Sequence, residues 1–241
     1  GSLNPNFETS NFRFGYTSLS TPTTIFEYNM NSKTKKILKQ RTVPASKFRS
    51  NNYIEKRLWA DSRDGKKIPI SLVYHKDTKL GLNSPLLLYA YGSYGYTIDP
   101  YFSSNRLSLL DRGVIFAIVH VRGGQYLGRS WYEDGKLLNK KNTFNDFIDS
   151  TRFLISNEIS SADHIHAIGG SAGGLLMGGI LNEAPFLYKS VIASVPFVDV
   201  ITTMLDKNIP LTTGEYDEWG NPNNEKYYNY IMSYSPYDNV K

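Results

Sequence analysis

Ile165-His-Ala-Ile-Gly-Gly-Ser-Ala-Gly-Gly174, followed by Leu175-Leu-Met-Gly-Gly-Ile-Leu-Asn182, contains the most specific structural pattern in this sequence. Residues 165–168 form a short apolar run, which is typical of a strand buried on both faces of a sheet. Residues 175–182 have the apolar character of a helix packed against such a sheet. The stretch therefore predicts a strand, a sharp turn at Ser171, and a helix that begins near Ala172.

The glycine and serine spacing of this turn indicates a particular chemistry. Gly169-x-Ser171-x-Gly173 matches the nucleophile elbow of the α/β-hydrolase fold, in which a strained turn projects a serine Oγ out of the sheet. The N–H groups at the start of the following helix can then bind a developing oxyanion. The bare motif is common, so a glycine-rich turn that only packs a helix on a strand is the plain alternative.

Two phosphate-binding motifs fit this loop less well. No Lys-Ser or Lys-Thr pair follows the glycines, as a nucleoside-triphosphate loop would require, and a dinucleotide-binding fingerprint would place glycine at position 171. The nucleophile elbow is the interpretation that the context favours.

Further apolar runs lie before and after residues 165–182. Residues 86–91, 114–119 and 191–195 resemble strands buried on both faces, and apolar residues between 144 and 155 follow helical spacing. Strands that alternate with helices predict a mostly parallel sheet flanked by helices, the α/β-hydrolase arrangement. Residues 53–59 and 68–74 flank a turn and predict a hairpin, in which Pro69 suggests an edge strand.

The N-terminal part has a different pattern and predicts a separate unit. Alternating residues from Phe12 onward, a second extended run at 25–28 and a third at 36–38 predict a small antiparallel meander. We expect three parts: the meander at residues 1–43, a polar linker at 44–52, and the α/β domain at 53–241.

The loop at residues 89–95, Tyr-Ala-Tyr-Gly-Ser-Tyr-Gly, is a candidate for the second oxyanion donor. It follows a predicted strand, its glycines permit close approach, and a tyrosine hydroxyl can donate to an oxyanion. The alternative is that Tyr91 is an aromatic residue of the core.

A catalytic base is harder to find. The four histidines are His75, His120, His164 and His166, and all precede Ser171. The α/β-hydrolase fold places the acid and then the histidine after the serine. We therefore expect the base to be missing from this chain, with His120 as the only distant candidate.

Composition excludes several classes of protein. The 241 residues include no cysteine, so disulfides, thiolate metal sites and a cysteine nucleophile are excluded. The chain has no apolar run of membrane-spanning length and no signal pattern at its start, so we expect a cytoplasmic protein without membrane contact. The chain has a net charge of +5, but acidic residues lie between its basic clusters, so we expect no nucleic-acid partner. We also expect no metal or cofactor.

Several motifs together resemble the prolyl oligopeptidase family. They are residues 89–94 (YAYGSY), 119–124 (VHVRGG), 131–135 (WYEDG) and 169–174 (GGSAGG). Residues 195–200 (VPFVDV), 211–215 (LTTGE), 219–222 (WGNP) and 233–238 (SYSPYD) resemble its oligopeptidase B (protease II) branch. The resemblance covers roughly residues 50–241, and residues 1–40 resemble the closing strands of the family's β-propeller.

This resemblance implies a cytoplasmic serine endopeptidase that cleaves short basic peptides after Arg or Lys. It assigns Ser171 as the nucleophile, and Tyr91 with the Ala172 N–H as the oxyanion hole. It also assigns Glu215 and Asp217 as the acidic pair that receives the P1 side chain, although the family's usual second residue is Glu. Without the resemblance, the acidic cluster at 215–218 would be interpreted as a solvated loop.

The second specificity pocket departs from the family pattern. The resemblance assigns Asp99 to one of two acidic positions near the P2 pocket, but the other position is Tyr101, which departs from the pattern that would favour a basic P2 side chain.

The family's catalytic acid and histidine lie in segments that would follow Lys241. We therefore expect an α/β-hydrolase domain truncated at its C-terminus, as a shortened product or one half of a split enzyme. Such a chain should be nearly inactive alone and could pair with a separate C-terminal segment or with itself through an open sheet edge. The alternatives are a non-catalytic remnant that acts as an interaction module, and a small-ester hydrolase.

Overall fold

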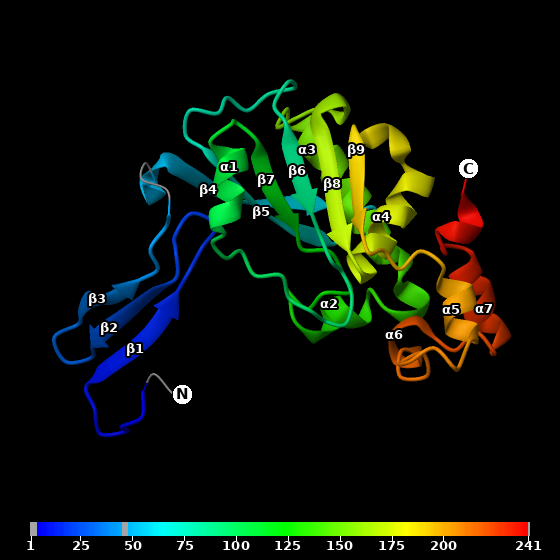
Figure 1. Cartoon of the computed structure of the whole chain (residues 1–241), viewed down its shortest axis with the longest axis horizontal. Helices are drawn as coiled ribbons and strands as arrows, with labels where there is room; N and C mark the ends of the chain where they lie inside the picture. The colour runs from blue at the N-terminus through cyan, green and yellow to red at the C-terminus, as the bar shows by residue number, and fades with distance from the viewer. Residues whose placement is uncertain (1–3, 45–47, 241) are drawn as a thin grey trace.

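The computed structural model describes residues 4–44 and 48–240, which form two β-sheets and the helices around the larger one (Figure 1). The smaller sheet is antiparallel, with the order β1-β2-β3, and the larger has the order β4-β5-β7-β6-β8-β9. The strands are β1 Asn11–Tyr16, β2 Thr24–Asn29, β3 Thr34–Gln40, β4 Tyr53–Asp61, β5 Lys67–His75, β6 Leu86–Tyr89, β7 Ile115–Val119, β8 Ile165–Gly170 and β9 Ser190–Ser194.

Helices cover both faces of the larger sheet. They are α1 Ser104–Leu110, α2 Arg129–Glu133, α3 Lys141–Ser156, α4 Ala172–Glu183, α5 Val200–Leu205, α6 Tyr216–Trp219 and α7 Glu225–Met232. Short 3₁₀ turns lie at Ser50–Asn52, Leu137–Asn139, Ala162–His164, Pro185–Leu187 and Tyr237–Asn239.

The parallel core of the sheet is β7-β6-β8-β9, and its apolar runs are buried because helices pack on both sides. On one face, α3 and α4 bury side chains such as Phe147 and Leu176 against Leu88. On the other face, α1 packs Leu107 and Leu110 against residues of β5 and β7. The predicted α/β architecture is thus confirmed.

β9 differs from the prediction of a strand buried on both faces. It pairs only with β8 among the described strands, and most of its residues are exposed, including Ile192 at 49%. An apolar run indicates a capacity for burial, but the neighbours that would bury it are not among the described residues. β9 is therefore an open edge.

Pro69 also departs from its prediction, because β5 is paired on both sides, with β4 and β7. The β5–β7 pairing spans Ile70↔Val119 to Val73↔Phe116, so Pro69 lies one residue outside it, where its missing N–H leaves the ladder intact. Its carbonyl still accepts the His120 N–H at 3.0 Å.

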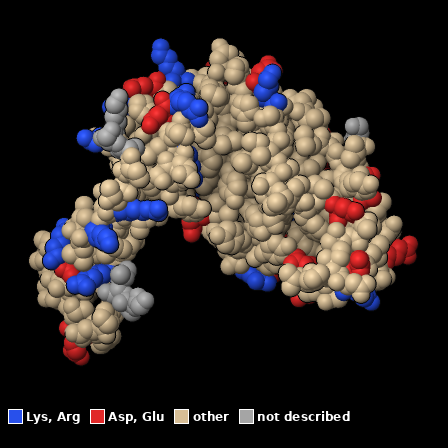
Figure 2. Space-filling model, in the orientation of Figure 1, with Lys and Arg blue, Asp and Glu red and all other residues tan. Residues whose placement is uncertain are grey.

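The three-stranded sheet extends away from the larger one and meets it near the start of β4 (Figure 1). Ser18 Oγ donates to Glu55 Oε1 at 2.6 Å, and Leu19, only 2% exposed, packs into the α1-side core. All of β3 is exposed, and Lys and Arg side chains gather over this sheet (Figure 2). The predicted linker at 44–52 lies partly outside the described residues, and the division into three parts stays a prediction.

Within the described ranges, no helix is both long enough and apolar enough to cross a bilayer.

Candidate active site

Ser171 occupies the sharp turn that the sequence predicts. β8 ends at Gly170 and α4 begins at Ala172, and Ser171 between them has φ 56° and ψ −119°. A side chain at position 169 would place its Cβ 2.3 Å from the Gly173 carbonyl oxygen, so only glycine fits there. The backbone is strained in the way an elbow requires, and the Ser171 side chain is exposed.

The start of α4 lies directly against the loop that follows β6. A Cβ at Gly173 would be 2.9 Å from the Ala90 carbonyl oxygen and 3.4 Å from Tyr91 Cδ2, so the helix and the loop are in close contact. Burial raises the pKa of the Tyr91 phenol, and a side-chain hydrogen bond with Ser171 opposes that rise. Tyr91 therefore lies beside the serine rather than in the core.

The backbone N–H groups of Ser171 and Ala172 have different roles in the turn. The Ser171 N–H donates to the Ser194 carbonyl at 3.0 Å, which ties the elbow to the end of β9. The Ala172 N–H is in the first turn of α4, where N–H groups have no acceptor within the helix. It is thus placed to donate toward an oxygen held near Ser171.

A pocket of about 220 Å³ opens beside Ser171. Three aromatic side chains form much of its wall, and one carboxylate, that of Glu215, lies in it. The lining residues are Tyr94, Ser171, Ala172, Phe197, Thr203, Met204, Ile209, Pro210, Leu211, Thr212, Glu215 and Trp219.

Glu215 is held in this pocket by two hydrogen bonds to a single oxygen. Its Oε2 accepts from the Tyr94 hydroxyl at 2.7 Å and from Trp219 Nε1 at 2.9 Å. Within the described part of the chain, Oε1 makes no hydrogen bond. The site therefore offers one fixed and partly exposed carboxylate oxygen to a cationic ligand.

The other predicted acidic residues lie away from Ser171. Asp217 is exposed on α6, and Asp99 and Tyr101 are exposed in the loop before α1. None of the three lines the pocket. The structure brings together Ser171, Tyr91, Ala172 and Glu215, and it does not bring Asp217 or Asp99 to them.

Two functional neighbours were not predicted from the sequence. Tyr94, at φ 60°, lines the pocket and reaches Glu215, and Glu218 is only 3% exposed. Glu218 accepts the Tyr94 N–H at 2.9 Å and the Tyr132 hydroxyl at 2.6 Å. The solvated-loop alternative is therefore wrong for Glu218. The sequence signal that could have indicated its burial is the neighbouring residue, Trp219.

None of the four histidines, all within the described residues, lines the Ser171 pocket. His120 is buried with Nε2 2.6 Å from Ser71 Oγ, and burial, aided by the charge of Arg57, lowers its pKa to about 3. His164 contacts Ser161, and His166 contacts Ser190. His120 is thus a neutral buried side chain that is unsuited to act as the base for Ser171.

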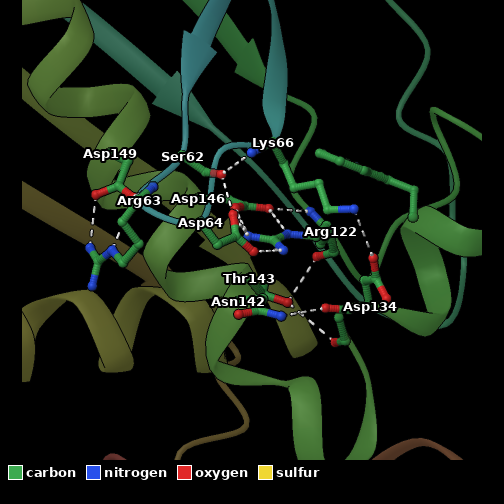
Figure 3. A network of polar contacts seen from close by, with 12 residues as sticks. Ser62, Arg63, Asp64, Lys66, Arg122, Asp134, Asn142, Thr143, Asp146 and Asp149 are labelled. Carbon is green, nitrogen blue, oxygen red and sulfur yellow. Dashed lines mark hydrogen bonds and ion pairs between the residues drawn. The ribbon is translucent and has the colours of Figure 1, made fainter.

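Arg122 belongs to a buried network of polar contacts (Figure 3). Arg122, 1% exposed, donates to both oxygens of Asp146 at 2.9 and 2.6 Å and also to Asp64. Its carbonyl accepts from Thr143 Oγ1 at 2.8 Å. The adjacent Gly123 carbonyl accepts the Gly95 N–H at 2.9 Å, so this network holds the loop that carries Tyr91.

No group of three or more His, Asp or Glu side chains in residues 4–44 and 48–240 is arranged to hold a metal ion.

An exposed serine at a strand-to-helix elbow, facing a loop tyrosine, is the arrangement of an α/β-hydrolase serine site. A family model described as the prolyl oligopeptidase family matches residues 100–241. The chain therefore belongs to the prolyl oligopeptidase family of serine peptidases.

Individual relatives extend this likeness over the whole chain. Dipeptidyl aminopeptidase BI of Pseudoxanthomonas mexicana is 54% identical over 241 residues, covering 100% of this chain and 33% of its own length. Protease 2 of Moraxella lacunata is 47% identical over 236 residues, covering 98% and 34%. The structure of oligopeptidase B from Leishmania major superposes with a TM-score of 0.90 at 50% identity, covering 98% of this chain and 33% of that one. The chain thus spans about one third of the length of these relatives.

Proposed function

We propose that this chain supplies the nucleophile, the oxyanion hole and the P1 pocket of a serine peptidase that cleaves short peptides after Arg or Lys. The observation that carries the proposal is the Glu215 carboxylate, fixed inside the pocket beside Ser171. A carboxylate among aromatic walls suits a guanidinium or ammonium group on an apolar stem.

The proposed reaction assigns a role to each group. Ser171 Oγ attacks the scissile carbonyl carbon while its proton passes to a base. The oxyanion that forms accepts hydrogen bonds from the Tyr91 hydroxyl and the Ala172 N–H. The C–N bond then breaks, the amine leaves with a proton, and water hydrolyses the acyl ester on Ser171.

We place the base outside these 241 residues, because no histidine follows Ser171 and none of the four that precede it lines the Ser171 pocket. A serine hydroxyl without an adjacent base is a weak nucleophile. The isolated chain is therefore expected to hydrolyse peptides barely or not at all.

The name of one relative indicates a peptidase activity that differs from the one proposed here. It is named a dipeptidyl aminopeptidase, whereas our proposal is an endopeptidase. In an enzyme completed with the missing base, substrates with a free and with a blocked N-terminus separate the two activities, and we expect comparable cleavage of both. Strict dependence on a free amine would instead support the aminopeptidase.

Substitution of Glu215 tests the P1 assignment. We propose a chimera in which this chain replaces the matching 236 residues of Moraxella lacunata Protease 2. Glu215→Gln should lower kcat/KM for Arg substrates by about tenfold to a hundredfold, because a charge-assisted contact contributes about 1.5–3 kcal/mol. Phe substrates should change little.

Glu225→Gln, an exposed position on α7, is the matched control and should have no effect on either substrate. Equal losses on Arg and Phe substrates in Glu215→Gln would mean that the carboxylate serves structure alone.

A further inference from the structure

Lys140 is a buried cation beneath the active-site surface. Its side chain is 1% exposed, and Nζ donates to the carbonyls of Gly92 at 2.6 Å and Gly135 at 3.2 Å, and to Ser93 Oγ at 2.9 Å. No carboxylate of the described residues forms an ion pair with it. Burial lowers its pKa to about 8, and the charge of Glu218 opposes this shift.

Lys140 contacts the loop that carries Tyr91, the proposed oxyanion donor. Gly92 directly follows Tyr91, and Ser93 directly precedes Tyr94. Gly92 has φ 75°, and a Cβ there would meet Thr143 at 2.4 Å, so the loop is pressed against α3 with no room to shift inward. Lys140 Nζ therefore fixes the backbone between the two tyrosines of the site.

The second contact of Lys140 is the wall of the pocket. Its ammonium lies 5.2 Å from the centre of the Trp219 ring, whose Nε1 donates to Glu215. The same wall is tied to the loop by Glu218, which accepts the Tyr94 N–H. Lys140 thus touches both the loop of Tyr91 and the helix α6 that follows Glu215.

We propose that Lys140 is a positioning residue that locks the Tyr91–Tyr94 loop and the Glu215–Trp219 wall into one rigid unit. It touches no substrate and acts through these two elements. The role in catalysis rests on the function proposed above, whereas the effect on loop order does not.

A buried ammonium is a costly way to fill this space, because it gives up hydration and gains no ion pair. A methionine would fill a similar volume without donating hydrogen bonds. Thr143 Oγ1 lies 3.4 Å from the Gly92 carbonyl and 3.3 Å from that of Gly135, but its single proton is donated to the Arg122 carbonyl at 2.8 Å, so both carbonyls lose their donor when Lys140 is replaced. Because methionine keeps the packing volume and only the contacts to the loop, the Gly135 carbonyl and Trp219 are lost, Lys140→Met should fold, with the loosening confined to the loop and the wall.

The test is hydrogen exchange measured by mass spectrometry on the 241-residue chain. The peptide covering residues 90–96 contains the Tyr94 and Gly95 amides, which donate to Glu218 and Gly123. In Lys140→Met these amides should exchange at least tenfold faster, while residues 68–74 of β5 stay protected. Lys141→Met is the matched control, since its ammonium faces Tyr230 instead, and it should leave both peptides unchanged.

Binding of benzamidine, an aryl amidinium cation, gives a second readout on the same samples. Lys140→Met should raise its Kd about tenfold, and Lys141→Met should not. If the wild-type chain fails to bind benzamidine, or Glu215→Gln does not weaken the binding, the proposed P1 pocket is contradicted. The exchange data still decide the role of Lys140 in that case.

Unchanged exchange at residues 90–96 in Lys140→Met would overturn the proposal. So would loss of protection throughout the chain, because Lys140 would then serve the whole fold. If Lys140→Met does not fold, Lys140→Leu, which likewise donates no hydrogen bond, is judged by the same criterion. Failure of both variants to fold also counts against a local role.

Discussion

At the scale of single residues, the site depends on positions where a side chain is either strained or forbidden. Ser171, Tyr94 and Leu211 all line the pocket and all have positive φ angles without being glycine. Such conformations are unfavourable and persist only where the surroundings enforce them. Their concentration around one pocket supports its assignment as the functional site.

Gly173 provides a residue-scale prediction. A methyl group there would lie 2.9 Å from the Ala90 carbonyl and would push α4 away from Tyr91. Gly173→Ala should lower the free energy of unfolding by about 1–3 kcal/mol, as overpacking usually does. Urea denaturation measures this change.

Gly81→Ala is the control for Gly173→Ala, because a Cβ at Gly81 meets open space and its φ is not positive. It should leave the midpoint nearly unchanged. Equal stability of Gly173→Ala and wild type would show that the helix and the loop are not in the tight contact described here.

At the scale of elements, the sequence predicted the strands and the turn that depend on a local pattern of residues. The apolar runs of β6, β7 and β8 predicted the buried strands, and the glycines around Ser171 predicted the elbow. Pairing partners depend on the whole sheet, so the interior position of β5 and the exposure of β9 were predicted wrongly.

The site residues divide in the same way. Ser171 was found from the glycine spacing between a predicted strand and a predicted helix, and Tyr91 from its place after a strand. The contacts of Glu218 with Tyr94 and Tyr132 join segments separated by 124 and 86 residues, and no local pattern reports such distances. The placement of Asp217 outside the pocket likewise depends on which way the short helix α6 faces.

β9 carries an element-scale prediction. Its exposed edge, with Ile192 at 49% exposure, offers unpaired backbone groups and apolar side chains to another strand. We expect the 241-residue chain to self-associate at micromolar concentration, and Ile192→Lys to shift it toward monomer. Sedimentation velocity measures the distribution.

Leu82→Lys, a similar change at an exposed leucine far along the chain, is the control for Ile192→Lys and should not alter association. A wild-type chain that stays monomeric throughout, or one that associates equally in Ile192→Lys, would contradict the assignment of β9 as the contact.

At the scale of the whole molecule, the described residues join a small antiparallel sheet to a helix-covered α/β unit. The site lies at the carboxyl ends of β6 and β8, where parallel strands bring separate loops together. In our proposal, the nucleophile, the oxyanion donors and the P1 carboxylate all come from this chain, and the base does not. The proposed enzyme therefore requires another segment to complete the site.

Labelling with a fluorophosphonate probe, with the labelled residue identified by peptide mapping, tests whether Ser171 needs another segment for its reactivity. It compares the isolated 241-residue chain with the chimera built on Moraxella lacunata Protease 2 and with its Ser171→Ala variant. We predict rapid labelling of the chimera at Ser171, none at position 171 in the variant, and labelling of the isolated chain at least about a thousandfold slower. Rapid labelling of Ser171 in the isolated chain, or a folded chimera labelled at another residue, would contradict the account.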